Sequence, residues 1–380
     1  MNFFDQSIDR TKTHCEKWDR YKDMDVIPAW VADMDFKAPD AVIEALKKRV
    51  EHGIFGYTAM DDETYDSVMD FILKHHNWKI KKEWIVWVNG VVSSMNLVCK
   101  MFGKDDSAIT TTPIYPHFIK APKNAKLGLN KVPLREINGR WSVDFDEFES
   151  KINSTCRLFL LCNPHNPGGT VFTKDELEKF GQICIKHDLV ICSDEIHADL
   201  VINPETKHIP IASLSEELAK RTITLMAPSK TFNIAGLQSS YAIIPDAKLR
   251  LKFQKQLRDL GDGINLLAIT ATKAAYQSGD EWLKMLKVYL ADNLTLIQDL
   301  IDKNQKLKML KSNATFLAWI DCKSLHVEDP YELFLGYGVG LSEGERFGDR
   351  NFVRLNFATT RENLKEILNR MQKAIDSVCR

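Results

Sequence analysis

Short apolar runs alternate with amphipathic stretches between about residue 85 and residue 244, and this pattern predicts a sheet covered by helices. Runs of roughly four to eight apolar and β-branched residues are typical of buried strands. Strands that alternate with helices favour a mostly parallel sheet with helices on both faces, whose ligands bind at the carboxyl ends of the strands. We expect these strands at 85–88, 108–111, 127–134, 157–162, 189–193, 222–226 and 241–244.

The segments on either side of this alternation have different patterns. Residues 1–30 have few periodic apolar positions and indicate an irregular arm. Apolar residues at helical spacing predict helices at 39–53, at 61–76, at 281–304 and after Thr360. Thr173 and Glu176 have the spacing of a capping box, so a helix begins there as well. Two apolar runs, 316–320 and 352–357, predict a second, smaller sheet.

Composition narrows the class of protein. The 380 residues have a net charge of −1 and are 44% hydrophobic, which fits a globular chain and gives no attraction to nucleic acid or membranes. No apolar run reaches the ~18 residues that span a bilayer, and the first residues lack the pattern of a signal peptide. The eight cysteines show no Cys-x-x-Cys spacing. We therefore expect a cytoplasmic protein with reduced thiols.

One lysine follows a predicted buried strand. The stretch from Ser229 to Gly236 reads Ser-Lys-Thr-Phe-Asn-Ile-Ala-Gly and comes directly after the apolar run at 222–226 and Pro228. A lysine in such a turn can hold a carbonyl compound as an imine, although its usual pKa of about 10.4 makes a free amine scarce. Taken alone, Lys230 is equally well interpreted as a solvated turn lysine.

Four further motifs accompany this lysine in a fixed order. They are Trp30–Phe36, His52–Thr58, Asn163–Gly169 and Ser193–His197, and Arg354 follows within Arg-Leu-Asn-Phe-Ala. In this order they resemble the fold-type I enzymes that use pyridoxal 5′-phosphate (PLP), the aspartate aminotransferase superfamily or class I/II aminotransferases. The finer details resemble the cystathionine β-lyase, or carbon–sulfur β-lyase, branch. The resemblance covers the chain from about residue 30 to about residue 358.

The resemblance implies an α/β fold with two parts. The large PLP-binding domain, residues 50–282, has a mostly parallel, seven-stranded sheet between helices, as in PLP-dependent transferases. Residues 1–49 and 283–380 form a smaller α+β domain from both termini. The implied activity is α,β-elimination of an L-cysteine thioether to pyruvate, ammonia and a thiol, in a homodimer.

The resemblance also assigns the residues around the cofactor ring. Lys230 binds PLP as an imine and moves the substrate's Cα proton, and Asp194 keeps the pyridine nitrogen protonated. His197 stands where many aminotransferases have tyrosine. Asn166 donates to the phenolic oxygen and reaches the substrate, and Tyr115 stacks on the ring. Without the resemblance, Asp194 is a helix cap or ion-pair partner, Asn166 a turn residue and Tyr115 a core residue.

Further residues are assigned to the phosphate and the substrate. The turn into a helix at Gly90, Val91 and Val92, with Ser229 and Asn233, is expected to bind the phosphate. Many relatives have arginine where this chain has Gln238, which leaves the details of phosphate binding open. Arg354, in an expected edge strand, suits a substrate carboxylate. Trp30 and Ala32 close over that carboxylate, and Tyr57 reaches the neighbouring subunit's site.

Several alternatives stay open at this stage. Asp194, Glu195, His197 and Asp199 also suggest a metal site, but strand alternation points neighbours to opposite faces, so we expect no metal. His75 and His76 indicate a solvated helix end. An aminotransferase on the same scaffold, or a regulatory PLP-binding protein with a partner, are the competing functions. The sequence does not identify the sulfur-containing amino acid that is the substrate.

Overall fold

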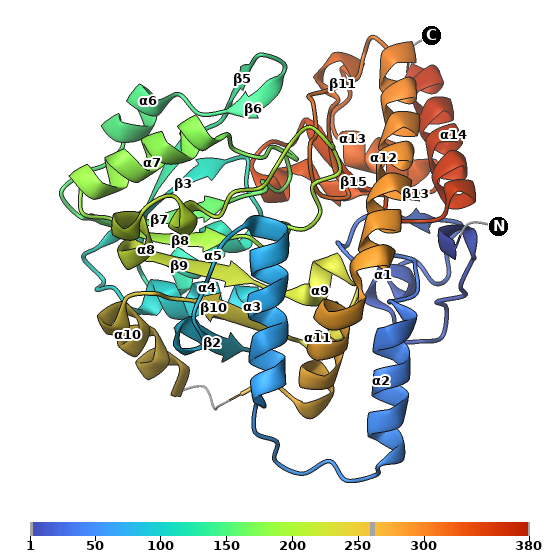
Figure 1. Ribbon diagram of the computed structural model, residues 1–380. Helices are drawn as coiled ribbons and strands as arrows, with labels where there is room; N and C mark the ends of the chain where they lie inside the picture. The colour runs from blue at the N-terminus through green and yellow to red at the C-terminus, as the bar shows by residue number, and fades with distance from the viewer. Residues whose placement is uncertain (1–2, 259–262, 379–380) are drawn as a thin grey trace.

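The structure is a computed structural model that describes residues 3–258 and 263–378 (Figure 1). The α-helices are α1 (Glu16–Asp19), α2 (Asp40–Glu51), α3 (Asp62–His76), α4 (Val91–Lys100), α5 (His117–Asn124), α6 (Phe145–Ser150), α7 (Lys174–Lys186), α8 (Glu216–Arg221), α9 (Pro228–Thr231), α10 (Ala247–Arg258), α11 (Leu266–Ser278), α12 (Asp280–Lys303), α13 (Pro330–Gly336) and α14 (Arg361–Val378). Single turns of 3₁₀-helix make the remaining helical segments.

The strands form one large sheet and three smaller ones. The large sheet has the order β2-β10-β9-β8-β7-β3-β4, in which β10 is antiparallel to both of its neighbours and the other pairs are parallel. Its strands are β2 (Ile85–Val88), β3 (Ser107–Thr112), β4 (Gly128–Pro133), β7 (Cys156–Cys162), β8 (Val190–Asp194), β9 (Thr222–Met226) and β10 (Ser240–Ile243). Each strand expected from the apolar runs is present, which confirms the α/β fold.

Alternate side chains of these strands pack into different cores. On β7, Leu158 and Leu160 face a core that includes α4, α5 and α10, whereas Phe159 and Leu161 face one that includes α6, α7 and α8. Further along that second face, α3 and α11 cover β2 and β10. Both faces of the sheet are therefore buried, which explains why its strands are continuous apolar runs. Thr173 and Glu176 form the expected capping box at the start of α7.

A four-stranded antiparallel sheet, β11-β12-β15-β14, lies apart from the large sheet on the side of the chain termini (Figure 1). Its strands are β11 (Lys308–Met309), β12 (Leu317–Asp321), β14 (Ser342–Glu343) and β15 (Phe352–Asn356). Because β14 covers its outer side, β15 is an inner strand, and the expectation of an edge strand for Arg354 was wrong.

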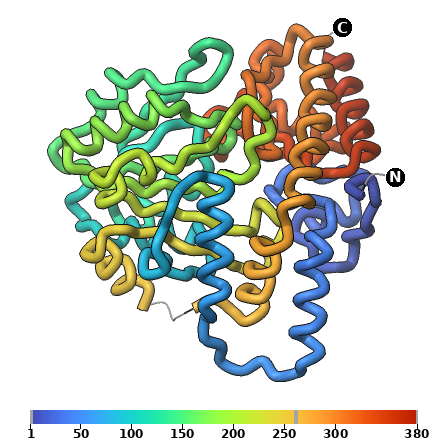
Figure 2. Tube along the Cα trace, in the orientation of Figure 1, coloured from blue at the N-terminus to red at the C-terminus, as the bar shows by residue number. Residues whose placement is uncertain are grey.

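The N-terminal segment lies against the C-terminal part of the chain (Figure 2). Strand β1 (Ile27–Pro28) pairs with β13 (Val339–Gly340), and the backbone of Ala29 accepts a hydrogen bond from Asn356 of β15. The hairpin of β5 (Arg135–Ile137) and β6 (Arg140–Ser142) completes the strands. The contacts fit a small part built from both termini, while the domain boundaries at residues 49/50 and 282/283 stay a prediction.

One helix end differs from its expected environment. His76, at the last position of α3, is buried, and its Nε2 lies 2.8 Å from the Asp199 carboxylate. The prediction of a solvated pair was wrong for this histidine, because the segment after β8 folds over the helix end. Within residues 3–258 and 263–378, no helix combines the length and the apolar character needed to cross a bilayer.

Candidate active site

A cavity of about 330 Å³ opens at the carboxyl end of the large sheet, where the topology places the ends of several parallel strands. Asp194 is the last residue of β8, and Lys230 lies in α9, just after β9. The segments after β2, β3 and β7 also reach the cavity. Its lining includes most of the predicted site residues: Ala32, Gly90, Val91, Val92, Tyr115, Asn166, Asp194, His197, Ser229 and Lys230.

The amine of Lys230 lies at the centre of this arrangement. Its Nζ donates to the backbone oxygen of Ala32 at 2.6 Å, and the side chain lines the cavity. Desolvation lowers the pKa of Lys230 to about 8, although the charge of Asp33 acts in the opposite direction. A lysine with this pKa has a much larger neutral fraction at pH 7–8 than a solvated lysine, and only the neutral amine acts as nucleophile or base.

Asp194 and His197 provide the polar groups of the cavity wall beside Lys230. Burial raises the pKa of the Asp194 carboxyl to about 7, and the only hydrogen bond to its side chain comes from the backbone N–H of Ile196 at 3.1 Å, within the described chain. Burial lowers the pKa of His197 to about 3, so this imidazole is neutral at pH 7. His197 Nδ1 is buried and has no hydrogen-bond partner among the described residues.

Arg354 is a buried cation whose hydrogen-bond partners within the described chain are all neutral. Its guanidinium donates to Asn166 Oδ1 at 3.0 Å, to the Trp30 backbone oxygen at 2.8 Å and to Ser342 Oγ at 3.2 Å. Phe347 covers one side of the guanidinium, with 4.6 Å between Cζ and the ring centroid. Burial lowers its pKa to about 10. A buried guanidinium without a carboxylate is strongly attractive to an anion, and a substrate carboxylate supplies one.

Asn166 and Tyr115 are brought next to each other by a backbone hydrogen bond. The N–H of Tyr115 donates to the carbonyl of Asn166 at 3.0 Å, and both side chains line the cavity. Burial raises the pKa of the Tyr115 hydroxyl, which therefore stays protonated at neutral pH. An aromatic ring and an amide consequently meet at one wall of the cavity.

The first turn of α4 forms the opposite end of the cavity. Gly90 precedes the helix, and its first residues, Val91, Val92 and Ser93, line the cavity together with Ser229. The first N–H groups of a helix have no partner within the helix, and the helix dipole favours an anion there. Gln238 also lines this cavity.

Four predicted site residues do not line this cavity: Trp30 and Arg354 line a hollow beside it, and Asn233 and Tyr57 line neither. The Asn233 side chain accepts from the N–H of Met34 and donates to the carbonyls of Met34 and Phe36, so its amide is fully used in holding that segment. Tyr57 is fully exposed on the loop between α2 and α3, and it contributes nothing to the cavity of its own chain.

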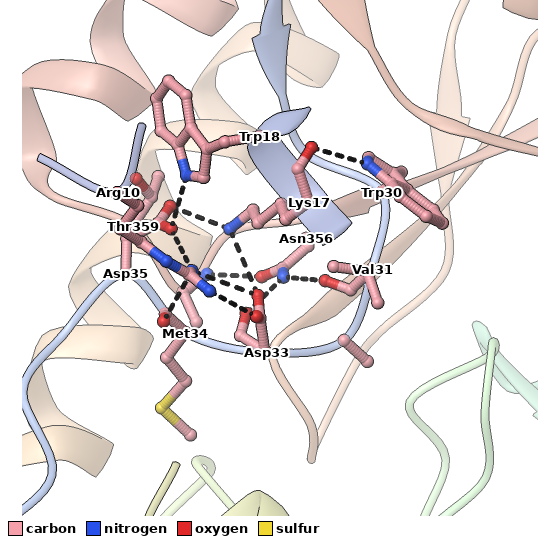
Figure 3. A network of polar contacts seen from close by, with 12 residues as sticks. Arg10, Lys17, Trp18, Trp30, Val31, Asp33, Met34, Asp35, Asn356 and Thr359 are labelled. Carbon is pink, nitrogen blue, oxygen red and sulfur yellow. Dashed lines mark hydrogen bonds and ion pairs between the residues drawn. The ribbon is translucent and has the colours of Figure 1, made fainter. Parts of the chain in front are cut away.

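A network of charges near the N-terminus fixes the segment that closes over Lys230 (Figure 3). We call Arg10, Lys17, Asp33 and Asp35 the N-terminal network. Arg10 pairs with Asp33 at 2.6 Å and with Asp35 at 2.7 Å, and Lys17 pairs with Asp35 at 2.8 Å. Ala32, whose carbonyl contacts Lys230, directly precedes Asp33. Sequence reasoning singled out the Trp30–Phe36 motif but not the two cations that hold it.

A second hollow of about 580 Å³ adjoins the cavity and shares Ala32, Tyr115 and Lys230 with it. Trp30 and Arg354 line this hollow, and its rim carries charges of both signs: Glu16, Arg20, Lys120, Glu343 and Arg346. A substrate bound by Arg354 has room there for a side chain that extends away from Lys230.

The cavity fits PLP by its donor set. Asp194 forms no ion pair with any described residue, so a protonated pyridine nitrogen would complete it and offset the cost of burying its charge. The start of α4 suits a phosphate. His197, whose Nδ1 has no partner among the described residues, and Asn166 suit a polar substituent of the ring, and Lys230 suits an aldehyde. The described residues include no group of three or more histidine, cysteine or acidic side chains that could hold a metal ion.

Comparisons with known proteins agree with this donor set. Residues 30–371 match the family model described as aminotransferase class I and II. The chain is 39% identical to cystathionine beta-lyase PatB of Bacillus subtilis (strain 168), covering 99% of this chain and 100% of that protein.

Two solved structures are similar over nearly the whole chain. Cystalysin from Treponema denticola, which contains PLP, has a TM-score of 0.94 and 34% identity, covering 99% of each chain. A PLP-bound putative aminotransferase from Clostridium difficile 630 has a TM-score of 0.95 and 39% identity, covering 99% of this chain and 100% of the other. The cofactor of the cavity is therefore PLP, and the chain belongs to the aminotransferase class I and II family.

Proposed function

We propose that this protein is a PLP-dependent carbon–sulfur β-lyase that converts an L-cysteine thioether to pyruvate, ammonia and a thiol. The observation that carries the proposal is a lysine of lowered pKa beside a buried arginine without a carboxylate, in a chain 39% identical to a cystathionine β-lyase over its full length. The lysine and the arginine fit an amino-acid substrate, and the similarity favours sulfur at its β-carbon.

In this proposal Arg354 binds and orients the substrate. Two of its N–H groups can form parallel hydrogen bonds to an α-carboxylate, and the neutral oxygens around it leave the charge free for that anion. Trp30 and Ala32 lie beside Arg354 and Lys230 at the mouth and reduce the access of water. Asn166 contacts Arg354 and is thus placed between the carboxylate and the cofactor.

Lys230 is the group that holds PLP and moves the proton. Its Nζ, with a pKa of about 8, takes the proton from the substrate's Cα and can return it to a leaving group. Bound PLP supplies the electron sink for that step. Asp194 supports this by a charged hydrogen bond to the ring nitrogen, and Tyr115 orients the ring by stacking. Loss of the β-sulfur as thiolate is favourable because the thiol pKa is only about 8.5.

A panel of amino acids tests this function. L-cystathionine, L-cystine and S-alkyl-L-cysteines are each incubated with the PLP-loaded protein, and pyruvate and thiol are measured. We expect both products from at least one thioether and none from L-alanine, which has no leaving group. Absence of pyruvate from the whole panel would contradict the proposal.

Aminotransferase activity is the second candidate, and the similarity to the putative aminotransferase of Clostridium difficile 630 favours it. The two candidates need the same Lys230, Asp194 and Arg354. They differ in the amino group, which a lyase releases as ammonia and an aminotransferase passes to an added oxo-acid. A regulatory PLP-binding protein is the third alternative, and it predicts cofactor binding without turnover.

We also infer a homodimer in which Tyr57 reaches the neighbouring subunit's site. The loop between α2 and α3 exposes Ile54, Phe55 and Tyr57, an apolar surface that a second copy would cover. Mixing Tyr57→Phe subunits with Lys230→Ala subunits then restores part of the activity in hybrid dimers. Hybrids that are formed but no more active than their parents would rule out a shared site.

A cytoplasmic location is part of the same proposal. The cysteines of the described chain are free thiols, and all of them except Cys15 are buried. Reduced, buried thiols are typical of proteins that work in a reducing compartment.

A further inference from the structure

A second cavity, with a volume of about 1190 Å³, lies between the end of α3, the segment from Ala198 to Ser213 and the first turns of α12. It shares no lining residue with the PLP cavity. In Figure 1, α3 and the segment from Ala198 to Ser213 face the viewer, between the large sheet and the long α12. We name it the α3–α12 cavity. The proposed lyase reaction uses none of its side chains.

Lysines without ion-pair partners surround the α3–α12 cavity. Lys79, Lys207, Lys284 and Lys287 line it, and none of them forms an ion pair with another residue of the described chain. Lys284 and Lys287 lie three positions apart in α12 and so project from the same side of that helix. Four free cations at one cavity are a local excess in a chain whose net charge is −1.

The other charges at the cavity are already paired. Lys74 and His75 both contact Asp280, and Asp292 contacts Arg361 at 3.1 Å. Asp199 is held by His76 at 2.8 Å and by the Thr231 hydroxyl at 2.7 Å. The acidic groups of the lining therefore do not neutralise the four lysines, and the cavity keeps a positive potential.

Two buried histidines give the cavity a polar wall. His76 and His208 both line it, and their rings meet edge to face at 5.4 Å. The Nε2 atoms are bound to carboxylates, His76 to Asp199 at 2.8 Å and His208 to Glu195 at 2.7 Å. Both Nδ1 atoms are buried and lack a hydrogen-bond partner among the described residues. Carboxylates thus hold both imidazoles in place, and the two rings form a fixed part of the wall.

From these observations we propose that the α3–α12 cavity binds an organic anion with two or more phosphate or carboxylate groups. Oxyanions match the lysines, which can donate charge-assisted hydrogen bonds to them. A volume of 1190 Å³ is far larger than one inorganic ion needs, and Ile202, Val288 and Ala291 add apolar surface for the body of the ligand. The site is separate from the proposed reaction and does not depend on it.

Calorimetric titration of the PLP-saturated protein tests this site. The probes are sodium tripolyphosphate and citrate at constant ionic strength, with saturating PLP to keep phosphates out of the cofactor cavity. We expect at least one probe to bind, with one ligand per chain. Binding of tripolyphosphate alone identifies phosphate groups as the preferred chemistry, and binding of citrate alone identifies carboxylates.

Two double variants locate the binding. Lys284→Gln with Lys287→Gln removes two exposed charges from the cavity and is expected to raise the Kd at least about tenfold. Lys252→Gln with Lys255→Gln makes the same change of charge at the same spacing on α10 and is expected to leave the Kd unchanged. If neither probe binds, or if the α12 variant keeps the full affinity of the unaltered protein, the proposal is wrong.

Discussion

Lys17 and Arg354 are both buried cations, but only Lys17 has carboxylate partners. Its Nζ lies 2.8 Å from Asp35 and 3.8 Å from Asp33, whereas Arg354 contacts only neutral oxygens. The N-terminal network is complete within the chain and fixes a backbone segment (Figure 3). The PLP cavity and the hollow beside it hold Asp194, Lys230 and Arg354 incompletely paired, so that a cofactor and a substrate complete them.

The pKa shifts also differ between the N-terminal network and the PLP cavity. In the N-terminal network the cations Lys17 and Arg10 lower the pKa of Asp35, against the effect of burial. In the PLP cavity burial prevails, and it raises the pKa of Asp194 and lowers those of Lys230 and Arg354. A buried charge that has its partners therefore stabilises the fold, whereas a buried charge that lacks them is available for binding and catalysis.

Removal of the Lys230 amine from the PLP cavity should have the largest effect on activity. Lys230→Ala is expected to reduce pyruvate formation by about 10⁴-fold or more, since both the attachment of PLP and the proton transfer are lost. Borohydride should fix PLP to the peptide that contains Lys230 in the unaltered protein and not in the variant. Fixation to a different lysine would contradict the assignment.

Substitution of Arg354, the buried cation without a carboxylate partner, should have the second-largest effect on activity. Arg354→Gln is expected to lower kcat/KM by about 10²-fold or more, mainly through KM, because the substrate carboxylate loses its partner. Arg350→Gln is the matched control, as Arg350 is an exposed arginine that contacts the Glu328 carbonyl. Equal, small effects of the two substitutions would show that Arg354 does not bind substrate.

A substitution in the N-terminal network should lower the stability of the fold. Lys17→Met leaves the Asp35 carboxylate buried with one cation fewer and is expected to lower the free energy of unfolding by about 3 kcal/mol. Lys22→Met, at an exposed position, is the control and is expected to change it by less than about 0.5 kcal/mol. Urea unfolding measures both. A loss no greater than that of the control would mean that the network does not hold the segment.

The last effect depends on one proton at Asp194 in the cofactor-free protein. The native carboxyl keeps its proton up to about pH 7, while the unfolded chain loses it near pH 4. Native protein therefore binds more protons between these values, so this group makes stability fall as pH rises, by at most about 1.4 kcal/mol per pH unit. Asp194→Asn should remove that fall. Parallel pH profiles for both proteins would contradict the raised pKa.

The large sheet could be predicted because its strands other than the edge strand β4 are buried on both faces and are therefore runs of apolar and β-branched residues. The carboxyl ends of parallel strands meet at one edge, so residues as distant as Asn166, Asp194 and Lys230 were expected in one place. The family resemblance then supplied the roles of Tyr115 and Arg354, which spacing alone could not.

Other features depend on contacts that no local pattern contains. The inner position of β15 depends on β14, two residues long and invisible to periodicity. His76 looked solvated because its partner Asp199 lies 123 positions away. Asn233 was assigned to the phosphate, yet it holds Met34, 199 positions away. Arg10 and Lys17 lie in an arm without periodicity, and nothing in its sequence distinguishes them from surface charges.

The most direct test of the account is the fate of the amino group when the PLP-loaded protein meets a good thioether substrate. Pyruvate, thiol and ammonia are measured in one sample without an added oxo-acid and in a second sample with it. The account predicts sustained release of all three, over many turnovers, at the same rate in both samples. Formation of about one equivalent per chain of the 2-oxo acid of the intact thioether, without release of thiol or pyruvate and with turnover only when an oxo-acid is added, would contradict it and identify an aminotransferase.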